Sequence, residues 1–145
     1  MGQPATNHLL NRLLAIVGRS FPQYLQYSRP YIPPGRASVK ETIDAIVGDQ
    51  NVMVERLSQK LIDSKTPPRF GEFPIVYTDL HDLDIDYLMR MAVDYQEQDI
   101  ASIGKIVDEL RLAPAAQSLA EEISGMTKGH LDSLLELLPE ATANG

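Results

Sequence analysis

The chain has 145 residues, of which 43% are hydrophobic and 23% are charged, and this composition suits a single globular domain with its own hydrophobic core. Its formal net charge of −7 excludes nucleic acid as an expected partner, because an acidic surface repels the phosphate backbone. The chain contains no cysteine, so disulfides, thiolate metal sites and cysteine nucleophiles are excluded as well.

The first residues show no basic stretch followed by a long apolar run, so we expect no signal peptide. Apolar runs are only a few residues long, which is too short to span a membrane, and no segment pairs a basic face with an apolar one. We therefore expect a cytoplasmic protein without a membrane partner.

The first segment with a helical apolar period covers residues 6–27. Pro22 lies inside this pattern and removes a backbone donor, so it predicts a kink at residues 18–20. The proline-rich stretch from Arg29 to Gly35 ends the helix, because residues before proline avoid the helical conformation. The apolar stripe of the segment is formed by Leu10, Leu13, Val17, Ser20 and Tyr24.

The second segment opens with Ser38 and Glu41, whose spacing predicts a capping box at a helix start. The helix is expected to stop at Thr66, before two prolines. Residues 67–78 follow, and they are long and apolar for a loop, so we expect them to cross over the helices. A short strand at residues 74–77 is the alternative, although it has no partner strand. The stripe of this helix is Ile43, Val47, Gln50, Val54, Leu57 and Leu61.

The third segment begins at Asp79 or Asp82 and continues to Leu112, with acidic side chains in its first turns, where the helix dipole favours them. The fourth begins at Pro114, a good first-turn residue, and is closed by Pro139. We expect one all-α domain over residues 1–140, a four-helix bundle made of two helical hairpins joined by one long crossover, and a disordered tail at residues 141–145.

Three motifs resemble those of bacterioferritins, in the same order along the chain. They are Leu10-Asn-Arg-Leu-Leu14 with Gln23, Tyr24 and Arg29; Glu41-Thr-Ile-Asp44 with Glu55-Arg-Leu57; and Gly129-His-Leu-Asp-Ser-Leu134. The resemblance implies a ferritin-like fold. In that family each of two helices supplies a carboxylate, and each of the other two supplies a Glu-x-x-His pair, to bind two iron ions.

Most of the implied iron ligands are missing here. Val17 stands at the position of the first glutamate, and Thr127 at that of the last. The second-helix pair falls on Ala45 and Gly48, or on Ile46 and Asp49 in the other register, and neither register gives Glu-x-x-His. The resemblance leaves Asp94 and His130 as relict metal candidates, with Asp49 conditional on the register. This set is too small for two iron ions.

Polar residues also interrupt the apolar stripes, and buried polar groups must be hydrogen-bonded. We expect Tyr24, Gln50, Asp99 and His130 to form a buried polar layer in the space that a metal centre would otherwise occupy.

No catalytic residues are predicted. We expect a non-enzymatic ferritin-like protein with a role in association or small-ligand binding and no cofactor. Tyr24, Tyr27, Tyr31 and the apolar crossover would form a homodimer face. The alternative is a weak metal-binding protein, with iron or zinc, involved in iron handling or oxidative stress. A larger shell of many copies is a third hypothesis.

Overall fold

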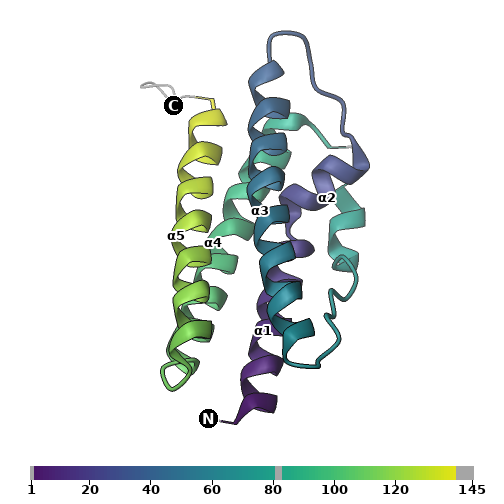
Figure 1. The fold of residues 1–145 in the computed structure, drawn as a ribbon. Helices are drawn as coiled ribbons and strands as arrows, with labels where there is room; N and C mark the ends of the chain where they lie inside the picture. Colours follow the sequence, from purple (N-terminus) through teal and green to yellow (C-terminus); the bar gives the residue numbers. More distant parts are fainter. Residues whose placement is uncertain (1, 81–82, 140–145) are drawn as a thin grey trace.

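The computed structural model describes residues 2–80 and 83–139 (Figure 1). Over these ranges the chain is helical and contains no strand, which confirms the all-α prediction. None of the helices in the described ranges combines the length and the apolar content that a membrane span needs. The helices in chain order are α1 (Gln3–Gly18), α2 (Phe21–Ser28), α3 (Ala37–Asp63), the short 3₁₀ helix η1 (Ile75–Leu80), α4 (Ile85–Glu109) and α5 (Pro114–Leu137).

The first predicted helix is divided into α1 and α2 by a break at residues 19–20. Ser20 has extended backbone and caps α2, since its side chain accepts a hydrogen bond from the backbone N–H of Gln23. Pro22 therefore lies in the first turn of a new helix, where its missing N–H has no cost. The expected kink at residues 18–20 is a complete break, because a capping serine and a first-turn proline start a helix more effectively than they bend one.

The predicted capping box at the start of α3 is wrong. α3 begins at Ala37, so Ser38 is already inside the helix, and the residue before it, Arg36, makes no side-chain capping bond. The Arg36 side chain instead forms an ion pair with Asp86, and it donates a hydrogen bond to the Leu137 carbonyl oxygen over 3.0 Å. Arg36 thus ties the start of α3 to the start of α4 and the end of α5.

The segment between α3 and α4 folds back over the helices, as its apolar composition predicts. It forms η1 and no strand, because the Tyr77 N–H donates to the Pro74 carbonyl oxygen over 3.0 Å and closes a turn. Tyr77 is buried, and Phe70 packs against the core beside Gly18. A β-carbon at Gly18 would lie 3.0 Å from the Phe70 ring, so the glycine permits this close approach.

The start of α4 is set by Asp84, whose side chain accepts hydrogen bonds from the backbone N–H groups of Asp86 and Tyr87. The predicted starts were earlier: Asp79 lies in η1, and Asp82 lies outside the described residues. Helix α5 begins at Pro114, as predicted. The tail at residues 141–145 also lies outside the described part of the chain.

The helices bury two hydrophobic clusters. α1 and α2 both pack on α3, α4 packs along α5, and α3 also contacts α5 (Figure 1). We name the clusters by the helices that begin them. The α1 cluster includes Leu13, Val17, Met53, Leu57, Ile103, Ile106, Leu119 and Ile123. The α2 cluster includes Phe21, Tyr24, Ile43, Val47, Tyr77, Leu88, Met89, Val93 and Leu134.

The two helix starts give a direct test of the corrected capping. Asp84→Ala should lower the free energy of unfolding by about 1 kcal/mol, because it leaves two first-turn N–H groups of α4 without their acceptor. Ser38→Ala should change it by less than about 0.5 kcal/mol, since Ser38 is an exposed residue inside α3. Urea unfolding measures both, and an equal loss in the two variants would restore Ser38 as a cap.

Candidate functional site

A layer of polar side chains separates the α1 cluster from the α2 cluster. On α3, Gln50 lies between Val47 of one cluster and Met53 of the other. Each of the long helices α3, α4 and α5 likewise passes from one cluster to the other through polar residues. We call these residues, together with Ser20 at the break, the polar layer: Ser20, Gln50 on α3, Gln96 and Asp99 on α4, and Thr127 and His130 on α5. All of them are buried except Asp99, which is half-buried.

Hydrogen bonds of the polar layer join it both between segments and within single helices. The Ser20 hydroxyl donates to Gln50 Oε1 over 3.0 Å and so joins the break to α3. Gln96 Nε2 donates to Asp99 Oδ2 over 3.2 Å, and the Thr127 hydroxyl donates to the carbonyl oxygen one turn earlier on its own helix. The structure therefore satisfies these groups largely in pairs, which is the minimum that burial of polar atoms requires.

His130 is anchored from the surface. Its Nε2 lies 2.9 Å from Asp49 Oδ2, and the Asp49 side chain remains 63% exposed. Within the described residues, His130 Nδ1 and Gln96 Oε1 are buried without a hydrogen-bond partner. The polar layer thus has two incompletely satisfied members in an otherwise apolar interior, and each costs stability.

Asp99 is the acid of the polar layer, and its ionisation is perturbed. Burial raises its pKa from 3.8 to about 7, because a desolvated carboxylate is less stable than the neutral acid. Burial also raises the pKa of Tyr77 well above its usual value, and the charge of Asp99 adds to the effect. Asp99 on α4 and Tyr77 on η1 are therefore electrostatic neighbours.

The predicted site residues are only partly brought together. Gln50, Asp99 and His130 lie in the layer between the clusters, whereas Tyr24 packs in an aromatic group with Phe21, Phe73 and Tyr77 at ring-centroid distances of 5.3–6.4 Å. Asp94 is exposed, and His130 is paired with Asp49 instead. Among residues 2–80 and 83–139, no three His, Asp or Glu side chains group closely enough to hold a metal ion.

Sequence reasoning missed Ser20, Gln96 and Thr127 as members of the layer. Gln96 could have been found, because Met89, Val93 and Gln96 follow one another at spacings of four and three and so share a helix face. Ser20 was placed on an apolar stripe, but its role as both a cap and a hydrogen-bond donor depends on the helix break.

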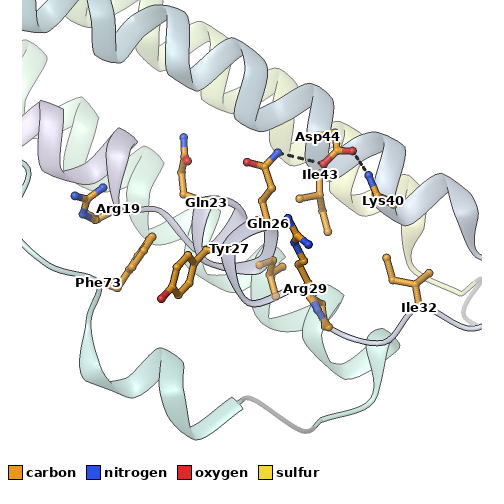
Figure 2. A pocket seen from close by; sticks show the side chains of 12 residues that line it. Arg19, Gln23, Gln26, Tyr27, Arg29, Ile32, Lys40, Ile43, Asp44 and Phe73 are labelled. Carbon is orange, nitrogen blue, oxygen red and sulfur yellow. Dashed lines mark hydrogen bonds and ion pairs between the residues drawn. The ribbon is translucent and has the colours of Figure 1, made fainter.

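A second feature is an open groove of about 1170 Å³ outside the core (Figure 2). Its floor is apolar, with Leu25 and Ile43 buried beneath it and Ile32 at one end. The rim is polar and charged. The groove is lined from α2 and its flanks by Arg19, Gln23, Leu25, Gln26, Tyr27, Arg29, Pro30 and Ile32, from α3 by Lys40, Ile43 and Asp44, and from the crossover by Phe73.

Three of the four charged residues on the rim, Arg19, Lys40 and Asp44, are held by neighbours. The Arg19 guanidinium lies 5.2 Å from the centroid of the Phe73 ring, and its Nε donates to the Gly71 carbonyl oxygen over 3.0 Å. Asp44 accepts hydrogen bonds from Lys40 over 2.6 Å and from Gln26 over 3.2 Å (Figure 2). These two bonds, that of Lys40 first, lower the pKa of Asp44 and keep it ionised.

The raised pKa of Asp99 predicts a stability that falls with rising pH. Because the folded-state pKa lies above 3.8, the folded chain binds more protons than the unfolded chain between pH 3.8 and about 7, and the free energy of unfolding falls across this window. Asp99→Asn cannot ionise but still accepts from Gln96, so it should stabilise the protein by about 2 kcal/mol near pH 8 and much less near pH 5.

Urea unfolding of Asp99→Asn and of the wild type at the two pH values measures this difference. Asp94→Asn is the matched control, since Asp94 is an exposed aspartate on the same helix. Because its side chain is already in solvent, this substitution should change the free energy of unfolding little at either pH. Equal gains for the two variants at both pH values would contradict a desolvated Asp99.

Neither the family models, nor the curated proteins, nor the solved structures searched for likeness to this chain gave a match. The polar layer and the groove are the features of the described residues from which a function follows most directly. Most side chains of the polar layer are buried between the helices, whereas the groove is open to solvent. Of the two, only the groove can admit a ligand without rearrangement of the helices.

Proposed function

We propose that the chain is a ferritin-like four-helix bundle in which α1 and α2 together replace one long first helix. Three observations support this arrangement. α1 and α2 pack on the same partner, α3; α4 pairs most extensively with α5; and a long crossover separates the two groups. The polar layer then lies at mid-height, where bundles of this type carry polar side chains on facing helices.

Within this fold we propose a non-enzymatic role, the binding of a small ligand in the groove between α2, α3 and the crossover. The observation that carries the proposal is the groove itself, which is large enough to hold a small molecule and combines an apolar floor with a polar rim, as small-molecule sites do. Its acid, Asp44, is already engaged by Lys40 and Gln26, which leaves it poorly placed to act as a general base.

The alternative of an iron or zinc protein has less support from the geometry. His130 turns one ring nitrogen to Asp49, and the other, Nδ1, is buried. Asp94, the second relict candidate, is exposed on α4. A mononuclear site would need a third ligand near His130, and the described residues supply no such group.

A neutral apolar dye tests the groove. We expect Nile red to bind with increased fluorescence, and Tyr27→Ala to weaken binding about three- to ten-fold, because Tyr27 and Phe73 form an aromatic wall with centroids 6.1 Å apart. Tyr31→Ala is the matched control: both tyrosines are 77% exposed, but Tyr31 does not line the groove.

The expected result is a loss of dye binding in Tyr27→Ala and wild-type binding in Tyr31→Ala. An absence of Nile red binding to the wild type would contradict a ligand groove at this place. An equal loss of Nile red affinity in both variants would show that the dye binds exposed aromatic surface in general and not the groove.

Self-association is a second candidate role, favoured by apolar side chains left in solvent beside the groove. Ile75 and Val76 at the start of η1 are exposed, as are Tyr27 and Tyr31, and α2 and η1 lie on the same side of the molecule (Figure 1). Tyr24 is buried and is not available to such a face. We propose a homodimer formed through these residues.

Light scattering of the purified chain should then give a mass twice that of the 16.1 kDa monomer. Ile75→Asp should shift the protein to a monomer, because it places a charge in the contact. The control is Leu112→Asp, a similarly exposed apolar residue at the distant turn between α4 and α5. A monomeric wild type, or a mass of many copies, would contradict the homodimer.

A further inference from the structure

The groove is positively charged although the protein is acidic. Its lining includes the cations Arg19, Arg29 and Lys40 and the anion Asp44, a formal charge of three minus one, or +2. The whole chain carries −7. A surface with this imbalance attracts anions to one place and repels them from the rest.

Arg29 is the cation of the groove that is not already engaged. Arg19 is held by Gly71 and two aromatic rings, and Lys40 is paired with Asp44. Over residues 2–80 and 83–139, the Arg29 side chain makes no hydrogen bond or ion pair with the protein. Figure 2 shows it within the groove, between Tyr27 and Ile32 in that view. Its guanidinium is therefore available to a ligand, and its planar fork suits a carboxylate.

The backbone of Arg29 gives a second, independent reason to look at this residue. It ends α2 in the left-handed conformation, with φ 51° and ψ 66°. Glycine is the usual residue at such a position, because a β-carbon is strained there, and the proline that follows restricts the backbone further. The Arg29 N–H donates to the Leu25 carbonyl oxygen over 3.0 Å, a bond that a glycine would also make. The side chain forms no hydrogen bond or ion pair among the described residues that would offset the strain, which points to a role outside the fold.

Apolar side chains line the groove around Arg29, beside the polar groups of its rim. Ile32 and Pro30 follow it along the chain, Ile43 forms the floor, and Tyr27 and Phe73 close one side. We infer that the groove binds a small amphipathic organic anion, with its carboxylate on Arg29 and its apolar body along this floor. This inference rests on the proposed ligand groove and adds the chemical class of the ligand.

Octanoate and octanol are matched probes, since they share the same chain and differ in the charged end. Octanoate should displace Nile red from the groove at least ten-fold more effectively than octanol, because a charge-assisted pair with arginine is worth about that factor. Raising NaCl from about 0.05 M to about 0.5 M should weaken octanoate and leave octanol unchanged.

Arg29→Gln should reduce the octanoate affinity about ten-fold and the octanol affinity less than two-fold. Arg29→Gly separates ligand binding from folding, because it relieves the left-handed strain. It should unfold at a temperature at least as high as the wild type and should still lose octanoate binding. Arg111→Gln is the control, since Arg111 is an exposed arginine at the far turn and should bind both probes as the wild type does.

The outcomes distinguish the two proposals. If Nile red and octanol bind in the groove but octanoate binds no better, or Arg29→Gln and Arg29→Gly leave octanoate unaffected, the anion inference is overturned and the ligand groove stands. If none of the three probes binds, the proposed function fails, and the inference fails with it. Selective octanoate binding that is lost in both Arg29 variants and kept in Arg111→Gln supports both.

Discussion

The constraint on which the rest of the structure depends is the burial of a polar layer between two apolar clusters. Desolvation of Gln50, Gln96, Asp99 and His130 opposes folding, and only some of their polar atoms find partners. The two apolar clusters have to compensate for this cost. The layer also fixes the axial position of each helix relative to its neighbours, because sliding a helix by one turn would place its polar residue inside an apolar cluster.

The break between α1 and α2 links this interior to the groove. Ser20 caps α2 with the same hydroxyl that donates to Gln50, so one side chain in the layer sets where the groove helix begins. Tyr77 makes a comparable link from the crossover, because it packs on Phe21 and lies near Asp99. The two walls of the groove are thus each positioned by contacts with the buried layer, although the ligand site itself is at the surface.

Sequence periodicity was sufficient to predict the long helices α3, α4 and α5, because their faces repeat over many turns and Pro114 marks a start. It was not sufficient for the ends that depend on distant contacts. At the start of α3, the Arg36 side chain binds Asp86 and the Leu137 carbonyl oxygen, which lie 50 and 101 residues away in the chain. The local capping pattern at Ser38 was therefore misleading. Burial of Gln50 and His130 followed from their stripes, whereas the pairing of His130 with Asp49 required the three-dimensional arrangement. The groove could not be predicted, since the crossover that closes it has no repeat.

The shortness of α2 has a further consequence for the groove. A helix of eight residues does not hold together in water by itself, so α2 persists only while Phe21, Tyr24 and Leu25 stay docked. Undocking α2 should cost less free energy than undocking α3, whose 27 residues pack against α1, α2 and α5. Such local unfolding would remove the groove while the remaining helices stay folded. Binding in the groove and folding of α2 are therefore thermodynamically linked. A ligand in the groove contacts α2 and so stabilises the docked helix, which is too short to be stable by itself.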